Sequence, residues 1–195
     1  MRVRPAGDRA VLFEVADNAE AVHLARALRA RGDLVDVVPG HRTVLAVWAG
    51  GDAPRLDGVS VESAPAPAEA RLVEIPVRYD GPDLADVARL AGVSPEEVAA
   101  RHAAGVYTVA FLGFAPGFAY LLGGDELLHV PRLASPRERV PAGSVAVAGP
   151  YSAVYPRESP GGWRLLGRSD LVLFDPQRTE PALLAPGDRV RFVAA

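Results

Sequence analysis

Short apolar runs surround one amphipathic stretch at the start of this 195-residue chain. Residues 18–31 carry apolar side chains at helical spacing, so they predict a helix that is capped by Asn18 and ended by Gly32. Runs rich in valine and leucine lie before and after this helix and predict strands, at residues 10–15, 34–38, 43–48 and 59–62. This order of elements predicts one helix packed on a small antiparallel sheet.

Residues 63–70, with the sequence SAPAPAEA, interrupt this pattern with two prolines among small residues. Such a composition is typical of a linker. We therefore expect two domains, an N-terminal α+β domain in residues 1–70 and a second domain in residues 71–195.

The second domain begins with a predicted strand at residues 72–79 and continues with two short helical segments. The second helix opens with a capping box, in which Ser94 is the cap, Pro95 takes the first helical position and Glu97 follows three residues after the cap. From Val106 onward, short strand-forming runs alternate with glycine and proline turns. Closely spaced strands of this kind predict an antiparallel β-barrel or sandwich.

Residues 103–124 contain no charged side chain, and the length of this stretch meets the criterion for a transmembrane helix, about 20 mostly apolar residues. Pro116 and several glycines would break such a helix repeatedly, and the stretch lacks flanking basic anchors. We therefore expect a strand at residues 106–113, followed by a loop. Both faces of this strand are apolar, with Phe111 on the same face as Tyr107, so both need cover.

Composition narrows the classes of protein. The formal net charge is −3 without long runs of either sign, so neither nucleic acid nor a membrane is an expected partner. The chain has no lysine, which excludes a phosphate-binding G-x-x-x-x-G-K-[ST] loop, a Schiff-base lysine and a Ser-Lys pair. It has no cysteine, and its four histidines lack the spacing of a zinc motif, so no metal site is predicted. The first residues hold no export signal, and we expect a cytoplasmic protein.

Four features could carry chemistry, and each has a structural alternative that the residues alone leave open. Residues 113–121, GFAPGFAYL, place aromatic side chains beside a tightly turning backbone. These side chains could line a binding site, or they could fill a corner of the core. Residues 130–149 carry arginines whose forks suit a carboxylate or phosphate, or simply face solvent. Residues 159–167 join a Gly-Gly turn to a tryptophan, as an anion site or as a plain hairpin. His102 could be a general base, or a cation that complements the end of its helix.

Several longer segments resemble one family, in order and nearly end to end. They are GDRAVLFEV, IPVRYDGPDL, FLGFAPGFAYL, PRERVPAGSVAVAG, SPGGWRLLGRSDLVLFDP and LLAPGDRVRFV. The family is known under three names: allophanate hydrolase subunit 1, the B subunit of 5-oxoprolinase, and inhibitor of the sporulation histidine kinase. The resemblance implies an N-terminal α+β domain followed by a cyclophilin-like antiparallel β-barrel.

The resemblance also implies partners and an activity. In the 5-oxoprolinase, members pair with a second cyclophilin-like barrel subunit, which is the C subunit of that enzyme. Together with a lactam-utilisation protein, which is its A subunit, they open 5-oxoproline to L-glutamate at the expense of ATP. A small amide or lactam is thus the expected substrate. ATP with a divalent metal is the expected cofactor, bound mainly by partner subunits, and the chain is expected to be inactive alone.

The family names leave two alternatives open. One is a regulatory module that inhibits a sensor histidine kinase, and the other is a carboxyltransferase-like subunit that acts on urea or another amide. Allophanate hydrolysis itself is not expected, because the amidases that perform it use a Ser-Ser-Lys apparatus and this chain has no lysine.

Three stretches of the chain match the site-forming stretches of the family. We expect Arg137, Ser144 and His102 to act in catalysis, with Arg137 on a substrate carboxylate or phosphate. The amides of residues 143–144 and 161–162 are expected to hold an oxyanion. The expected substrate-binding residues are Gly113, Phe114, Pro116, Gly117, Phe118, Tyr120, Pro141, Ala142, Gly143, Ser159, Pro160, Gly161, Gly162 and Trp163.

Two positions depart from the family pattern. Ala119 stands where proline is common, and Pro150-Tyr151 stands where many members carry a small polar residue followed by glutamine. If that glutamine contacts the substrate, a tyrosine there bears on which substrate the site accepts.

Overall fold

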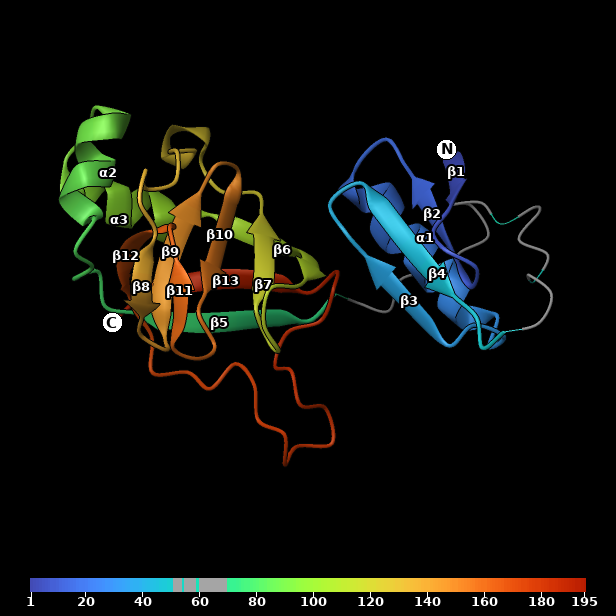
Figure 1. The fold of residues 1–195 in the computed structure, drawn as a ribbon. Coiled ribbons are helices and arrows are strands. Elements are labelled where there is room, and N and C mark those ends of the chain that lie inside the picture. The colour runs from blue at the N-terminus through green and yellow to red at the C-terminus, as the bar shows by residue number, and fades with distance from the viewer. Residues whose placement is uncertain (51–53, 55–58, 60–69) are drawn as a thin grey trace. The chain divides into compact units, whose positions relative to one another are not determined.

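The computed structural model describes residues 1–50, 54, 59 and 70–195, and it divides into two compact units, Met1–Glu69 and Ala70–Ala195. This division lies one residue from the predicted domain boundary. Figure 1 shows a small sheet with a helix in the first unit and a larger, curved sheet in the second. The predicted strand at residues 59–62 lies outside the described residues, except for Val59.

The first unit is a four-stranded antiparallel sheet against which one helix packs. The strands follow the order β1-β2-β4-β3, with β1 at Arg2–Pro5, β2 at Ala10–Glu14, β3 at Asp36–Pro39 and β4 at Thr43–Val47. Helix α1 spans Asn18–Ala30. Phe13 and Val44 from the sheet and Leu24 and Leu28 from the helix are buried together in the core of this unit.

The start of α1 differs from the prediction. The side chain of Asp17, not that of Asn18, accepts a hydrogen bond from the amide of Glu20 at 2.9 Å. The Asn18 side chain instead donates to the carbonyl of Gly40 at 3.3 Å. Asp and Asn are equally suited to an N-cap, so the sequence alone could not separate the two neighbours. Gly32, after the helix, has the predicted left-handed conformation, with φ of +75°.

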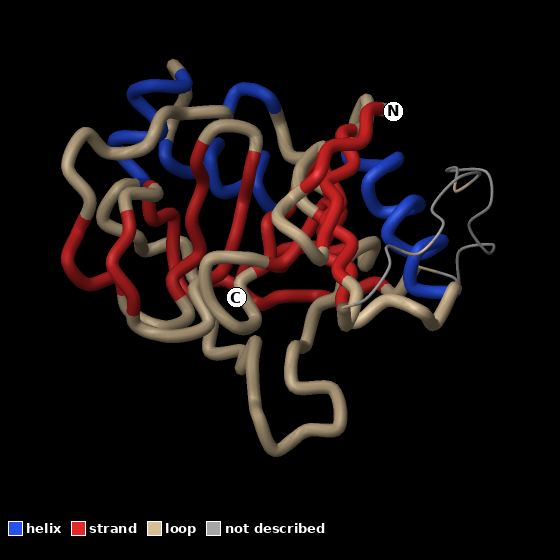
Figure 2. Tube along the Cα trace, turned by 45° about the vertical axis from the view of Figure 1, so that its right-hand side comes forward, coloured by secondary structure: helices blue, strands red, loops and turns tan. Residues whose placement is uncertain are grey.

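The second unit is a seven-stranded sheet that curls into a nearly closed barrel (Figure 2). The strands follow the order β12-β9-β10-β7-β6-β13-β5. Their bounds are β5 Leu72–Val77, β6 Val106–Leu112, β7 Ala119–Leu122, β9 Ser144–Ala148, β10 Tyr151–Val154, β12 Arg164–Arg168 and β13 Arg189–Ala194. Just beyond β5, Arg78 pairs with Arg168 of β12 through two backbone hydrogen bonds of 2.9 Å, which join the two edges of the sheet.

The predicted fold class, an α+β domain followed by a barrel, is confirmed with one difference in strand direction. Strand β13 pairs in parallel with β5, whereas the prediction had antiparallel strands throughout. These are the first and last strands of the unit. The rest of the barrel therefore serves as the long connection that a parallel pair requires.

The second unit also contains two α-helices, α2 at Leu84–Ala91 and α3 at Pro95–Ala104, and a short 3-10 helix, η2 at Glu126–Leu128. Ser94 caps α3 by accepting a hydrogen bond from the amide of Glu97 at 3.2 Å, which confirms the predicted cap. Among the described residues, no helix has the length and apolarity needed to cross a membrane.

The uncharged stretch forms β6, a loop and β7. Tyr107 and Val109 of β6 belong to the main buried cluster of the barrel. The register of β6 against β7 shifts between Val109 and Phe111, and the Phe111 ring stacks on that of Tyr120, 4.3 Å away between centroids. The prediction that Phe111 shares a face with Tyr107 is wrong, because a bulge breaks the two-residue alternation of the strand.

Candidate functional site

The three stretches predicted to form a site meet on the outer face of the barrel sheet. They are the loop before β7, the turn before β9, and a two-stranded ribbon of β8 (Arg137–Val140) and β11 (Ser159–Gly161). On β9, Val145 belongs to the barrel core and its neighbour Ala146 to a second cluster, so this second cluster lies on the opposite face. We call it the outer cluster, and its buried members are Phe118, Val140, Ala146, Ala148, Ala153, Tyr155, Trp163 and Leu165.

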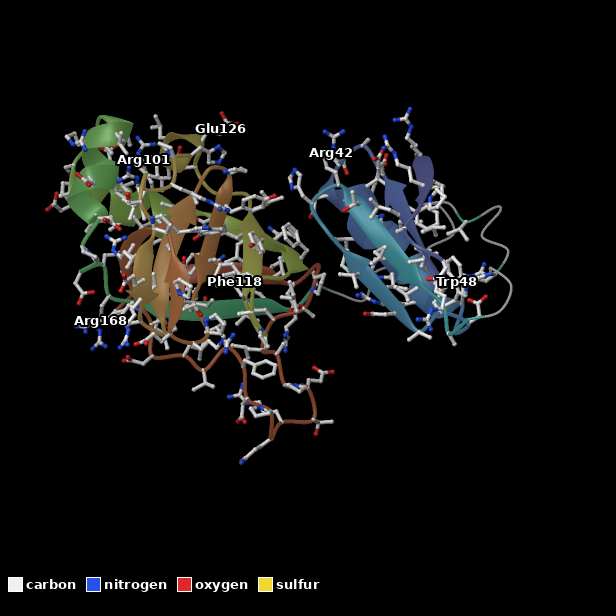
Figure 3. All side chains as sticks on the ribbon, viewed as in Figure 1. Arg42, Trp48, Arg101, Phe118, Glu126 and Arg168 are labelled. Atoms are coloured by element: carbon white, nitrogen blue, oxygen red, sulfur yellow. The ribbon has the colours of Figure 1, made fainter. Side chains whose placement is uncertain are left out.

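Phe118, labelled in Figure 3, belongs to the second unit and contacts most of the aromatic rings of the outer cluster. Its ring centroid lies 5.1 Å from that of Tyr120, 5.3 Å from Tyr155 and 5.5 Å from Trp163, each in edge-to-face geometry. Aromatic pairs of this kind contribute about 0.5–1.5 kcal/mol each beyond the area they bury. Phe118 and Trp163 are 1% and 5% exposed, so these two predicted site residues support the site from below its surface.

Phe114 is the exposed aromatic residue of this region. It is 58% exposed and is the only non-glycine residue with a positive φ, +66°, in the described part of the chain. This conformation costs a residue with a β-carbon about 1–2 kcal/mol and persists only where the surroundings enforce it. Backbone hydrogen bonds within the loop do so, among them Gly113 N–H to the Phe118 carbonyl at 3.1 Å. The loop thus exposes the Phe114 ring to solvent while hydrogen bonds fix the backbone that carries it. A surface that binds a ligand or a partner needs both properties.

The other predicted binding residues divide by exposure. Pro116, Pro141, Ala142 and Pro160 lie at the surface, whereas Gly117 and Ser159 are buried. A β-carbon on Gly117 would lie 2.6 Å from the β-carbon of Phe174, and φ there is +78°, so this glycine shapes the loop. The Ser159 hydroxyl donates to the carbonyl of Arg157 at 3.2 Å. The described residues bring together no group of three or more His, Asp or Glu side chains that could hold a metal ion.

Arg137, at the start of β8, is held by a buried carboxylate. Its Nη2 donates to Asp83 Oδ1 at 2.7 Å, and Asp83 Oδ2 accepts from the amide of Leu165 at 2.7 Å. The Asp83 side chain is 6% exposed and that of Arg137 is 28% exposed. The Nη1 group of Arg137 is buried and lacks a hydrogen-bond partner among the described residues. Asp83 therefore fixes one side of the guanidinium and leaves the other side for a further acceptor.

The amides of Gly143 and Ser144 do not form the predicted oxyanion site. Gly143 N–H donates to the carbonyl of Tyr155 at 2.8 Å, and Ser144 N–H donates to that of Pro141 at 3.3 Å. Gly143 has φ of +79°, and a β-carbon there would lie 2.2 Å from the carbonyl oxygen of Ser169. Ser144 is itself only 5% exposed. The prediction was wrong because the sequence does not show which amides the turn itself consumes.

The second predicted amide pair, Gly161 and Gly162, lies beside Arg137. Gly161 is the ladder partner of Arg137 across the β8–β11 ribbon. A β-carbon on Gly161 would lie 2.3 Å from the hydroxyl oxygen of Tyr155, so glycine is what lets this hydroxyl approach the ribbon. The carbonyl of Gly162 accepts from the amide of Leu133 at 2.7 Å, which ties the arginine-bearing loop to the same place.

Tyr155 and Asp83 also lie beside Arg137 in this candidate site, and the sequence predicts a site role for neither. Burial raises the pKa of the Tyr155 hydroxyl, while a hydrogen bond from the Trp163 amide and the charges of Arg132 and Arg137 act to lower it. The hydroxyl is therefore within electrostatic reach of both guanidinium groups. Neither missed residue carries a local signal, because Tyr155 reads as an ordinary strand residue and Asp83 as a helix cap.

His102 is a structural residue of the barrel core and not the predicted catalytic base. It is fully buried, with Nδ1 2.8 Å from the Tyr79 hydroxyl and Nε2 2.8 Å from Ser152 Oγ. The Ser152 hydroxyl donates to the carbonyl of Ala146 at 3.2 Å, so Nε2 carries the ring proton and Nδ1 accepts from Tyr79. Both ring nitrogens are thus occupied. Burial lowers the pKa of His102 from 6.5 to about 3 and keeps the ring neutral.

This buried histidine makes stability depend on pH. Below pH 6.5 the unfolded chain binds a proton at His102, whereas the folded chain does not bind it until about pH 3. The stability that the neutral His102 ring contributes is therefore lost progressively as pH falls from 6.5 to about 3. The expected slope is about 1.4 kcal/mol per pH unit. The free energy of unfolding is measured with urea at pH 7.5, 6.5, 5.5 and 5 in the parent protein and in His102→Gln. Its slope against pH should be smaller by this amount in the variant. The same slope in both proteins would contradict the assignment.

Tyr151, where the sequence departs from the family pattern, borders the outer cluster. Its ring centroid lies 5.4 Å from that of Tyr120 and 6.4 Å from that of Trp163. Tyr151 is partly exposed. A large aromatic ring thus occupies the edge of the region that the three predicted stretches form.

The whole chain has counterparts among known proteins. It matches the family model for the carboxyltransferase domain, subdomain C and D, over residues 1–184. It is 43% identical to the B subunit of the 5-oxoprolinase of Escherichia coli O157:H7, across 96% of this chain and 93% of that protein. Identity to the protein of the same name from Haemophilus influenzae is 41%, across 87% of this chain and 83% of that protein.

Solved structures agree with this match. The chain is similar to TTHA0988 with a TM-score of 0.82 and 43% identity, where 96% of this chain corresponds to 40% of that longer chain. It is also similar to PH0987 from Pyrococcus horikoshii, with a TM-score of 0.62 and 36% identity over 100% of this chain and 97% of that one. The Kluyveromyces lactis urea carboxylase shares the fold, with a TM-score of 0.73 at 19% identity over 99% of this chain and 21% of that one. The chain therefore belongs to the carboxyltransferase subdomain C and D family, in the branch of the 5-oxoprolinase B subunits.

Proposed function

We propose that this chain is the B subunit of an ATP-dependent 5-oxoprolinase, which opens 5-oxoproline to L-glutamate. The observation that carries this proposal is the near end-to-end match to the 5-oxoprolinase B subunit of E. coli, which leaves little of either chain unmatched. The H. influenzae protein of the same name supports it at similar identity.

The chain works with two partners, a second barrel subunit together with a lactam-utilisation subunit, and it is inactive alone. A longer relative supports such an assembly, since the counterpart of this chain is 40% of TTHA0988. In the proposed assembly, ATP and its divalent metal are held mainly by the partner subunits. We place the assembly in the cytoplasm, where ATP is available.

The outer cluster and the loops above it form one wall of the substrate site in this proposal. Hydrolysis breaks the lactam C–N bond of 5-oxoproline and adds one water across it, so that the carbon becomes a carboxylate and the nitrogen a protonated amine. A second water is consumed as ATP is converted to ADP and phosphate. The part of this chain is to hold and orient the small ring. The exposed ring of Phe114 packs against its apolar face, and Nη1 of Arg137 donates to one of its oxygens. Such positioning removes much of the entropic barrier to reaction.

The two alternatives find less support. The likeness to the urea carboxylase, at 19% identity, is one of fold, and it does not extend carboxyltransfer to this chain. A histidine-kinase inhibitor would need a binding surface and no 5-oxoproline, so an assay of substrate dependence separates it from the main proposal.

ATP hydrolysis by the reconstituted assembly tests the proposal. The chain is co-expressed and co-purified with its two partners, the second barrel subunit plus the lactam-utilisation subunit. Adding 5-oxoproline is expected to raise ATP hydrolysis, with glutamate appearing in step, and the chain alone should show neither. An intact assembly whose ATP hydrolysis does not respond to 5-oxoproline would end the proposal.

A further inference from the structure

We infer that Arg132, Arg137 and Tyr155 form a binding site for a single oxyanion group, a carboxylate or a phosphate, on the outer face of the barrel. The inference rests on the proposed function, in which the substrate carries a carboxylate and ATP carries phosphate. The Arg132 side chain lies over Trp163, the Tyr155 hydroxyl lies against Gly161, and Arg137 is the ladder partner of Gly161. Two sets of contacts bring these three residues together.

The first direction is the β8–β11 ribbon. Arg137 and Gly161 face each other in the ladder, and the Tyr155 hydroxyl packs against the α-carbon side of Gly161, where any β-carbon would lie 2.3 Å away. A phenol hydroxyl and a guanidinium are thereby anchored at neighbouring backbone positions. Both can donate a hydrogen bond to one oxyanion.

The second direction is the loop before the ribbon. The guanidinium carbon of Arg132 lies 5.7 Å from the ring centroid of Trp163, and the next residue, Leu133, is tied by its amide to the Gly162 carbonyl. The Trp163 ring packs on Phe118, which packs on Tyr155 at 5.3 Å. Arg132 therefore lies on the same aromatic group that carries the Tyr155 ring.

The balance of charge favours an anion. Asp83 offsets the charge of Arg137, while Arg132 is exposed and makes no ion pair within the described residues. Two guanidinium groups and one carboxylate leave one net positive charge at this place. Arg139, on the same strand as Arg137, is unlike Arg137 in that its side chain is 81% exposed. It is unlike Arg132 in that a carboxylate is close by, with Nε 3.9 Å from Glu158 Oε1.

The hydrogen-bond inventory points the same way. Nη1 of Arg137 is buried without an acceptor among the described residues, although buried N–H groups are almost always paired. The hydrogen bond from Arg137 Nη2 to Asp83 holds the guanidinium in place, so Nη1 cannot rotate toward solvent. An arriving oxyanion would satisfy Nη1 with a charge-assisted bond.

Fluorescence of Trp163 tests the site on the chain alone. The chain has two tryptophans, so Trp48→Phe in the first unit leaves Trp163, beside Arg132, as the single reporter. The protein is titrated at constant ionic strength with inorganic phosphate and, separately, with 5-oxoproline. A saturable change in emission is expected with at least one of them. Phosphate alone would identify a nucleotide phosphate as the source, and 5-oxoproline alone a substrate carboxylate.

Variants in the same background decide whether the change comes from this site. Arg132→Gln should raise the Kd about 10- to 100-fold, and Tyr155→Phe about 2- to 10-fold, the range for losing a charged and a neutral hydrogen bond. The matched control Arg139→Gln should stay within about twofold of the parent. Far-UV circular dichroism checks that each variant is folded.

Two results would overturn the inference: no saturable change with either anion, or equal weakening by Arg132→Gln and Arg139→Gln. Failure of the proposed function gives a different result, because an assembly that ignores 5-oxoproline could still contain a chain that binds an oxyanion at Arg132.

Discussion

Replacing Asp83 by alanine is expected to destabilise the barrel unit by about 3–5 kcal/mol, the range for breaking a buried ion pair by removing one partner. The variant leaves the guanidinium of Arg137 without its carboxylate and the amide of Leu165 without its acceptor, both at a place where the Asp83 side chain is 6% exposed. The loss is measured as a fall in the urea midpoint. Following Trp163 fluorescence in a Trp48→Phe background makes the signal report on the second unit.

Two control variants separate the buried pair from the general effect of removing a charge. Glu158→Ala breaks an ion pair with Arg139 whose side chains are 61% and 81% exposed, and it should cost less than about 1 kcal/mol. Asp83→Asn keeps an acceptor for the Leu165 amide and should recover part of the loss. If Asp83→Ala costs no more than Glu158→Ala, the pair does not hold the site together as described.

Replacing Gly167 by alanine is expected to cost about 3 kcal/mol or more, because the new methyl group meets backbone atoms that cannot move freely. A β-carbon on Gly167 would lie 2.1 Å from the carbonyl oxygen of Arg78. That oxygen accepts the amide of Arg168, one of the two hydrogen bonds that join the edges of the barrel sheet. Urea unfolding measures the loss, and faster amide hydrogen exchange at Arg78 and Arg168 would locate it at this seam.

Gly92→Ala is the matched control for this steric argument. Gly92 has φ of +71° but open space around its α-carbon, so alanine there pays only the backbone cost of about 1–2 kcal/mol. Gly167 shows the opposite combination, a close neighbour without a positive φ. Equal destabilisation by the two substitutions would contradict the close approach of Arg78 to Gly167.

The sequence predicted those elements whose start or buried face is set by residues close together in the chain. The capping residue Ser94 set the start of α3, and the apolar spacing of α1 showed its buried face. Strand β1 was not predicted, because three of its four residues are arginine or proline. It lies at the edge of its sheet, where proline is tolerated. The face of Phe111 was wrong because a bulge is a property of two paired strands.

The same limit applies to the site. The resemblance to the family assigned Phe118 and Trp163 to one site, and the structure packs both into the outer cluster. The partner of Arg137 is Asp83, 54 residues earlier, and no local pattern connects them. Likewise, the burial of His102 depends on Phe192, near the other end of the unit, whose tilted ring packs against it with centroids 4.3 Å apart.

Withholding this chain from the assembly and then restoring it tests the central claim most directly. The two partners, the second barrel subunit plus the lactam-utilisation subunit, are mixed with ATP, a divalent metal and 5-oxoproline, and glutamate is measured as purified chain is added. The account predicts no glutamate without the chain and a rise that saturates as the chain fills the assembly. Full glutamate formation by the partners alone would contradict it.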